Sequence, residues 1–302
     1  MTRLQVAAPL SSAALSGVLI EIPCPRTVLT QWLAERGPLG LASKAAKHPV
    51  YCELWSVRDG GLCVGNVSQH DLWEAGGRAS GIAMRAMAQM CAPRQGPLRD
   101  MLLGNAQAGA ERLPGLFRSF SRALVAPLST YFETMTWIPG VTLRGSQEPY
   151  SFVVGMFTDS AVARWADVAF GYGYRKQPAR FDVRSPEAFA VRATNGAPLI
   201  TFTGELLDAS LETGALAGVE RAVQYPLLGL TPSGALARST LKRSFATAES
   251  LAPLRGAVEL APGLVPGVRR RPAPSRSRSR KPYDALAFSN MRAVVSYPKP
   301  AV

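Results

Sequence analysis

Residues 131–157, YFETMTWIPGVTLRGSQEPYSFVVGMF, contain two apolar segments, 131–138 and 150–157, that have the composition of β-strands. Aromatic and β-branched residues are frequent in both segments, as is typical of strands that pack on a core. Turn-forming residues separate them, at Pro139-Gly140 and at residues 144–146. We therefore predict two successive strands in the middle of the chain.

Further strands are predicted on both sides of this stretch. Downstream, residues 188–193 and 198–203 flank Asn195-Gly196, which is a strong signal for a tight hairpin. Upstream, residues 50–57 alternate like a strand, and Asp59-Gly60-Gly61 predicts a turn into a second strand over 62–67.

Helical patterns are grouped elsewhere in the chain. Residues 26–36 predict a short helix that ends at Gly37-Pro38. Between residues 79 and 125, alanine, methionine, leucine and arginine dominate, and breaks at Pro93, Gly96-Pro97 and Pro114-Gly115 predict two or three short helices. Strands in series with helices grouped apart predict an α+β fold, with a mostly antiparallel sheet or barrel.

The composition excludes a disordered chain and a helical membrane protein. Of the 302 residues 47% are apolar and only 18% are charged, which is enough for a large core. Residues 4–20 loosely resemble a secretory signal, but Pro9, three serines and Glu21 predict ordinary folded sequence. No other stretch reaches the roughly 18 to 20 apolar residues that a membrane helix requires.

Much of the positive charge lies in one segment. The net charge is +13, and residues 269–281 carry seven positive charges and no acid, so the rest of the chain is only mildly basic. We predict one domain over residues 1–265, a linker rich in arginine, serine and proline over 266–282, and a C-terminal segment over 283–302 that packs back on the domain.

Several common functional motifs are absent from the sequence. The four cysteines have no C-x-x-C spacing, so we expect free thiols in a reducing compartment rather than a zinc site. His48 and His70 have no metal-ligand spacing and are predicted to be structural. No G-x-S-x-G, Walker or G-x-G-x-x-G motif occurs.

Lys176 is the most informative candidate for chemistry. It lies in the run FGYGYRKQP, residues 170–178, although only six of the 34 basic residues are lysines. An amine that is desolvated loses its proton and attacks carbonyl groups, which a guanidinium does not do at ordinary pH. Phe170, Tyr172 and Tyr174 are candidates for desolvating this amine, and Arg175 is a candidate for a neighbouring cation.

Residues 131–177 resemble the acetoacetate decarboxylase superfamily. Three motifs carry the resemblance, which covers roughly residues 129–206. Tyr131-Phe132-Glu133 begins the first strand, residues 158–160 (Thr-Asp-Ser) end the second, and residues 173–177 take the place of the family's lysine segment. The chain departs from the family at three points. Arg175 replaces the family's proline, Gln177 replaces its second lysine, and residues 168–170 replace its Gly-Arg-Glu.

The resemblance implies a Schiff-base enzyme that acts on a keto acid. Lys176 would form an imine with the substrate, and the reaction would be decarboxylation of a β-keto acid or a related aldol or dehydration step. Glu133 would orient the substrate or move protons. Arg175 would take the place of the second cation, and Tyr172, Tyr174 and Gln177 would contact the substrate. The resemblance implies no metal, no organic cofactor and a homo-oligomer, and the scattered cysteines favour a cytoplasmic protein.

Three other interpretations remain open from the sequence. Lys176 and Arg175 are also compatible with a solvated turn. A non-catalytic, ligand-binding descendant of the fold would pair Lys176 with an acid. The third interpretation is a nucleic-acid-associated protein that acts through residues 269–281, although no aromatic residues alternate with these arginines, so nucleic acid is the less favoured partner.

Overall fold

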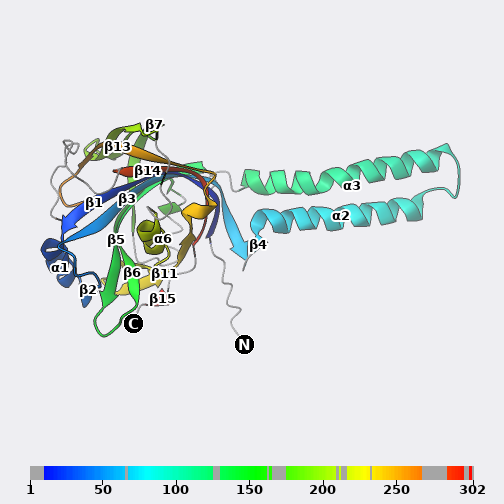
Figure 1. The fold of residues 1–302 in the computed structure, drawn as a ribbon. Coiled ribbons are helices and arrows are strands. Elements are labelled where there is room, and N and C mark those ends of the chain that lie inside the picture. The colour runs from blue at the N-terminus through cyan, green and yellow to red at the C-terminus, as the bar shows by residue number, and fades with distance from the viewer. Residues whose placement is uncertain are drawn as a thin grey trace.

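The centre of the molecule is a closed barrel of nine strands in the order β6-β7-β8-β9-β13-β14-β1-β3-β5, with β5 pairing back to β6 (Figure 1). All of these strand pairs are antiparallel except β6–β7. The computed structural model describes residues 10–64, 67–124, 130–161, 163–164, 175–208, 211, 216–231, 233–266, 284–295 and 299–300. The prediction of an α+β fold with a mostly antiparallel barrel is therefore confirmed.

The barrel strands alternate in the chain with short outer strands and helices. In chain order the elements are β1 (Leu10–Pro25), α1 (Arg26–Ala34), β2 (Leu39–Leu41), β3 (Lys47–Val64), β4 (Val67–Ser68), α2 (Gln69–Cys91), α3 (Pro97–Leu124), β5 (Thr130–Leu143), β6 (Pro149–Thr158), β7 (Lys176–Ser185), β8 (Ala188–Ala193), β9 (Pro198–Leu206), α6 (Ala217–Val223), β10 (Leu227–Leu230), β11 (Leu236–Ser239), β12 (Leu241–Arg243), the 3₁₀ helix η1 (Phe245–Thr247), β13 (Ser250–Leu260), β14 (Ala285–Val295) and β15 (Lys299–Pro300).

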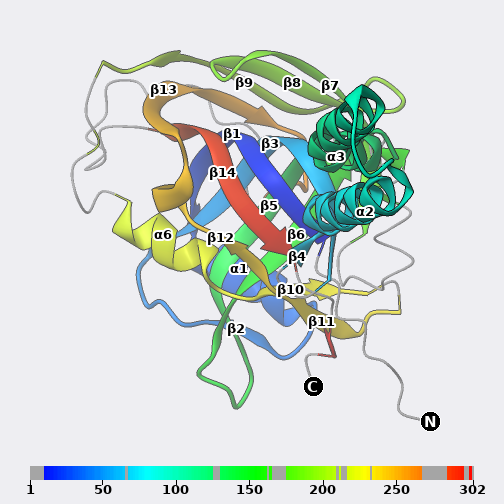
Figure 2. The same cartoon turned by 90° about the vertical axis from the view of Figure 1, so that its right-hand side faces the viewer.

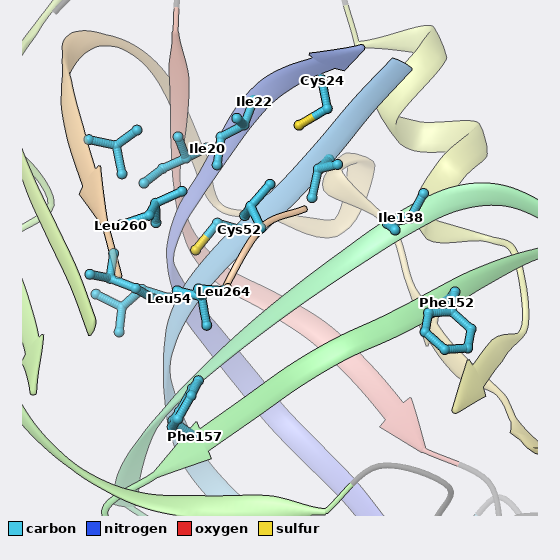
Figure 3. Packing of buried hydrophobic residues seen from close by; sticks show 14 of the residues in the cluster. Ile20, Ile22, Cys24, Cys52, Leu54, Ile138, Phe152, Phe157, Leu260 and Leu264 are labelled. Carbon is cyan, nitrogen blue, oxygen red and sulfur yellow. The ribbon is translucent and has the colours of Figure 1, made fainter. Parts of the chain in front are cut away.

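The barrel interior holds the larger of two apolar cores, to which all nine strands contribute. Figure 3 shows part of this core, including residues of β1, β3, β5, β6 and β13. Side chains of a strand alternate between its two faces, so every second residue points inward. On β3, for example, Cys52 and Leu54 belong to this core, whereas Glu53 between them points outward. Phe189 and Phe202 stack on adjacent strands with ring centroids 5.5 Å apart.

A second core lies on the outer face of β14, β1, β3, β5 and β6. Trp55, Met135 and Trp137 of the barrel wall pack there against Val223 of α6 and Phe245 of η1. α6 and the segment that follows it thus cover one outer face of the barrel (Figure 2). Polar groups that lie between this cover and the wall are shielded from water.

Most of the predicted strands and the first helix are confirmed. Strands β5, β6, β8 and β9 contain the segments predicted from the sequence, and α1 ends at Ala34, close to the predicted Gly37-Pro38. The hairpin at Asn195-Gly196 is present: Gly196 has φ +86°, and the side chain of Asn195 accepts a hydrogen bond from the backbone N–H of Ala197. Residues 10–20 belong to β1, as the prediction of folded sequence requires.

Two predicted turns are wrong. β3 continues through Asp59-Gly60-Gly61, because this part of the strand pairs along its length with β1, where Gly60 faces Ser12. The chain instead reverses after Val64, which pairs with Val67 of β4. Pro139-Gly140 lies inside β5 as a bulge, where the register with β6 shifts between Ile138 and Val141.

The prediction of two or three short helices over 79–125 is correct in the helical character and in the break around Pro93 and Gly96-Pro97, but wrong in helix length, because this region belongs to a hairpin of two long helices. α2 has 23 residues and α3 has 28, and together they project from the barrel as an arm (Figure 1). Pro114 lies inside α3 without ending it. The two helices touch closely there: a Cβ added to Gly77 of α2 would lie 2.8 Å from the Leu113 carbonyl oxygen. Packing of the helix pair thus outweighs the local helix-breaking tendency of proline.

The remaining candidates of the sequence analysis are structural or lie outside the described residues. His48 is buried and its Nε2–H donates a 2.7 Å hydrogen bond to the carbonyl of Pro139, as its predicted structural role requires. Cys52 and Cys91 are free thiols. The basic segment 269–281 lies outside the described residues. Among the residues that the structure describes, no helix is both long and apolar enough to cross a membrane.

Candidate active site

The outer face of β3 and β5 carries two carboxylates in an otherwise apolar surface. Tyr131, Glu133, Met135 and Trp137 alternate onto this face of β5, and Trp55 of β3 lies opposite Glu133 in the ladder. Glu53 lies opposite Met135, which makes it a diagonal neighbour of Glu133. Such neighbours have Cβ atoms about 7 Å apart or less, so the two carboxylates belong to one site.

Lys176 reaches Glu133 across the intervening strand β6. Glu133 pairs with Thr158 of β6, and Lys176, the first residue of β7, pairs with Met156. The Lys176 Nζ donates a 2.8 Å hydrogen bond to Glu133 Oε2. The exposed fraction is 14% for the Lys176 side chain and 5% for that of Glu133, so bulk water has little access to this ion pair.

The ends of β5 and β6 are tied together beside the ion pair. The Asp159 carboxylate accepts a 2.9 Å hydrogen bond from the backbone N–H of Phe132, and the Thr158 hydroxyl donates to the Phe132 carbonyl at 2.9 Å. Asp159, which marks the end of the second strand in the sequence motif, therefore holds the backbone next to Glu133. Its role in the described geometry is to position that strand.

A second ion pair, between Glu53 and Arg243, is buried in the same face. Arg243 ends β12, and its Nη1 contacts Glu53 Oε2; the exposed fractions are 2% and 0%. The guanidinium also lies 5.3 Å from the Trp55 ring centre and 5.6 Å from that of Trp137, within cation–π range. Gln224, which follows α6, donates a 2.6 Å hydrogen bond to the Arg243 carbonyl and so joins β12 to the cover.

Burial changes the proton affinity of two groups in this site. It raises the pKa of Glu53, against the opposing effect of the positive charge on Arg243. It also raises the pKa of Tyr131 to about 12, although the charge of Lys176 acts in the other direction. The Tyr131 phenol therefore keeps its proton at neutral pH and is able to donate a hydrogen bond beside Lys176.

The structure brings together some of the predicted site residues and not others. Lys176 and Glu133 are in contact. Arg175 precedes β7 and is exposed, so the expectation that it supplies the second cation of the site is not met. Gln177 alternates to the opposite face of β7 and is also exposed, away from the Lys176–Glu133 pair. Tyr172 and Tyr174 lie outside the described residues.

Glu53 and Arg243 are the site residues that the sequence analysis did not identify. The sequence contains one feature that could have identified Glu53: it is a charged residue between the apolar neighbours of a predicted strand. No such feature identifies Arg243, because the run Leu-Lys-Arg-Ser-Phe over 241–245 resembles many surface segments. Within the described part of the chain, no group of three or more histidine, cysteine, aspartate or glutamate side chains is arranged to hold a metal ion.

Of the comparisons with known proteins, only the one with solved structures finds similar proteins. No protein-family model matches the sequence, and no curated protein matches it. Among solved structures, the chain is similar to acetoacetate decarboxylase from Legionella pneumophila, with a TM-score of 0.51, 12% identity, and coverage of 98% of this chain and 87% of that one.

Two further solved structures have lower TM-scores. The enduracididine biosynthesis enzyme MppR complexed with pyruvate has a TM-score of 0.49 and 11% identity, over 99% of this chain and 92% of that one. An acetoacetate decarboxylase-like enzyme from Sphingomonas wittichii RW1 has a TM-score of 0.47 and 9% identity, over 99% and 95%. The barrel topology and the similarity to the Legionella enzyme lead to one conclusion: this chain has the fold of acetoacetate decarboxylase.

Proposed function

We propose that the chain is a Schiff-base lysine enzyme that acts on a keto acid through Lys176. The observation that carries this proposal is the contact of Lys176 Nζ with Glu133 Oε2 at 2.8 Å, in a largely buried setting. An amine next to a carboxylate and away from bulk water has a base within reach of its proton. The acetoacetate decarboxylase fold supports the substrate class, and MppR, which has been solved with pyruvate, is a similar structure.

The first part of the proposed reaction forms an imine. Glu133 takes a proton from the Lys176 ammonium, and the neutral amine attacks the keto carbon of the substrate. The resulting alkoxide takes one proton from the attached nitrogen, the hydroxyl then takes the other from Glu133, and water leaves. The product is a protonated imine that joins Lys176 to the substrate, with Glu133 again ionised beside its positive charge.

The second part depends on which bond of the substrate breaks. With a β-keto acid, the bond to the carboxylate breaks, its electron pair moves to the imine nitrogen, and carbon dioxide leaves an enamine. A proton then returns to carbon, and water hydrolyses the imine to release the ketone and free Lys176. With other keto acids, the ionised Glu133 would take a proton from the carbon next to the imine. The enamine that results would attack an aldehyde, or expel a hydroxyl group as water with the proton returned by Glu133, in aldol or dehydration chemistry.

The buried charge of Arg243 supports a substrate that carries a carboxylate. Arg243 Nε is buried and has no hydrogen-bond partner among the described residues. The guanidinium contacts Glu53, which is the diagonal neighbour of the Glu133 that Lys176 contacts. In the proposed complex this group attracts the carboxylate while the keto group meets the amine. Tyr131, neutral at ordinary pH, is the donor proposed for the keto oxygen.

Borohydride trapping tests the proposal. The protein is incubated with pyruvate, acetoacetate, oxaloacetate and 2-oxoglutarate in turn, reduced with borohydride, digested and analysed by mass spectrometry. We expect an adduct on the Lys176 peptide, and its loss in Lys176→Arg. Lys242→Arg is the matched control, because Lys242 is exposed on strand β12. Absence of an adduct with every keto acid, or adducts that persist in Lys176→Arg, would contradict the proposal.

The second candidate is a non-catalytic protein, because the contact between Lys176 and Glu133 is also what a purely structural ion pair would show. In that case Lys176 and Glu133 form a structural pair and no imine forms. Buried ion pairs are frequently replaced by apolar residues without loss of stability. The double variant Lys176→Met with Glu133→Gln would then fold and bind ligand as the native protein does, and no trapping would occur with the native chain.

A further inference from the structure

We propose that the helical arm formed by α2 and α3 is a self-association surface, which pairs with the arm of a second copy of this chain to form a four-helix bundle. This inference is independent of the proposed chemistry. It begins from the shape of the molecule, since the arm projects from the barrel and only its base adjoins the strands (Figures 1 and 2). Only one side of each helix is occupied by its partner helix within the arm.

The arm has an apolar face that nothing in the chain covers. With about 100° between successive residues of a helix, six large apolar side chains fall on one side of the helix pair. All six are exposed, and several are more than half exposed. They are Leu72, Met87 and Met90 of α2 and Leu98, Met101 and Leu116 of α3. Between the large residues of α2, the exposed Ala79 and Ala83 allow another helix to approach closely.

The opposite face of the arm is polar and its charges are paired within the arm. Arg118 of α3 contacts Glu74 at 2.6 Å and Asp71 at 3.9 Å, and Arg78 contacts Glu74 at 2.7 Å. Further along, Gln107 joins Arg85 to Glu111. These paired residues include three acids and three bases, so the contacts among them leave no net charge, although residues 69–124 as a whole contain seven arginines and four acids, a net charge of +3. The arm is therefore amphipathic as a unit.

This charge pattern favours a protein partner over a membrane surface. Helices that lie on anionic membranes usually carry an excess of lysine and arginine on the polar face, and aromatic residues anchor them at the interface. The excess here is small, a net charge of +3 over residues 69–124, and the polar face pairs its arginines with acids. The aromatic side chain of Trp73 contacts Phe117 and Phe120 at the base of the arm rather than at its tip. The apolar face contains one charge, Arg112, whose aliphatic stem is able to cover apolar surface while its head reaches the edge.

The size of the face matches what a stable dimer needs. A helix of 23 residues is about 35 Å long, and two helices side by side are about 20 Å wide. The face therefore offers on the order of 700 Å² per copy, near the roughly 800 Å² per partner that stable interfaces bury. An apolar face of this kind is self-complementary, and a two-fold axis would place the same face of each copy against that of the other, so that both are buried. A second copy thus buries all six exposed side chains without any other partner.

Sedimentation velocity of the full chain over a range of micromolar concentrations tests this inference. We expect a dimer, and a dissociation constant at least about 100-fold higher in the variant Met87→Glu with Leu116→Glu, because the interface would then bury unpaired charges. Ile82→Glu is the matched control. Ile82 is 61% exposed, against 60% for Met87, but it lies on the same helix about 140° away, on the polar side. The control is expected to remain a dimer.

Each other outcome would overturn the inference. A native chain that is monomeric at high micromolar concentration has no such interface. If both charge variants stay dimeric, or if Ile82→Glu dissociates as well, the apolar face is not the contact. Binding of the native chain to phosphatidylserine vesicles in flotation, lost in the double variant, would assign the face to a membrane instead. Circular dichroism checks that the double variant folds; if it does not, Met87→Gln with Leu116→Gln replaces it, with a smaller expected increase in the dissociation constant.

Discussion

At the scale of single residues, the outer face of the barrel wall is unusual because it buries two ion pairs in one apolar core. Lys176 with Glu133 belongs to the proposed chemistry, whereas Glu53 with Arg243 is still more deeply buried. A buried charge destabilises the folded state unless an opposite charge lies beside it. The loss of its hydration costs more free energy than attraction to a distant charge regains. The Glu53–Arg243 pair should therefore respond very differently to the loss of one member and to the loss of both.

Arg243→Met is expected to reduce the free energy of unfolding by about 3–5 kcal/mol, since it leaves the Glu53 carboxylate without its counter-charge. The double variant Glu53→Gln with Arg243→Met should recover most of this loss. Urea denaturation followed by circular dichroism measures both. Arg238→Met is the control: its pair with Glu148 is 3.8 Å long and about half exposed, and its removal should cost less than about 1 kcal/mol. Equal destabilisation of the single and double variants would contradict this account.

At the scale of elements, the arm depends on close contact of two helices along their length. Gly77 of α2 meets the backbone of α3 near Pro114, where a helix would otherwise be weakest. A side chain at this position would separate the helices. Gly104 of α3 is also a helical glycine, but a Cβ added there would have nothing within 4 Å. Substitutions at Gly77 and Gly104 therefore distinguish the effect of helix packing on stability from the effect of intrinsic helix propensity.

Gly104→Ala is expected to stabilise the arm by up to about 1 kcal/mol, because alanine is the better helix former. Gly77→Ala should destabilise it despite the same gain in propensity, since the new Cβ would lie 2.8 Å from backbone atoms of α3. Hydrogen exchange of residues 69–124, measured by mass spectrometry, reports the change within the arm. Faster exchange in Gly77→Ala and slower exchange in Gly104→Ala is the expected pair of results; exchange that slows in both variants would mean that the helices have room for the methyl group.

At the scale of the whole molecule, the barrel closes through strands from distant parts of the chain. β14 lies between β1 and β13, and the ring is completed where β5 pairs with β6. A closed ring has no free edge, so we expect it to unfold as one unit. Protonation of a group buried at a strand contact should therefore alter the stability of the whole barrel. His48 is such a group, because it joins the start of β3 to the bulge of β5 at Pro139.

The free energy of unfolding is expected to fall as the pH decreases below about 6.5. Burial lowers the pKa of His48 below its ordinary value of 6.5, the hydrogen bond to Pro139 opposes this, and the charge of Arg26 adds to the lowering. The unfolded chain thus takes up the proton first, and stability declines by up to about 1.4 kcal/mol per pH unit between the two pKa values. Urea denaturation at several pH values measures this slope, which should be smaller in His48→Gln, whose amide is able to donate to the same carbonyl. An unchanged slope would assign the dependence to other groups.

The sequence alone predicted those elements that depend on local chemistry. The strands around residues 131–138 and 150–157, the first helix and the hairpin at Asn195-Gly196 follow from side-chain alternation and turn residues. It did not predict the continuation of β3 through Asp59-Gly60-Gly61, because pairing with β1 over a long ladder outweighs a local turn signal. Likewise, Pro114 failed to end α3, because α2 supports the helix on one side.

Taken by itself, the chain determined its class of fold and the residue types of the proposed chemistry, and through a family resemblance it indicated that Lys176 and Glu133 act together. Only the tertiary structure decided which charged groups meet. Arg243 and Glu53 are 190 residues apart in sequence, and no local pattern relates them. The physical reason is that strand pairing and sheet closure bring distant segments to one face, where desolvation then requires that each buried charge find an opposite one.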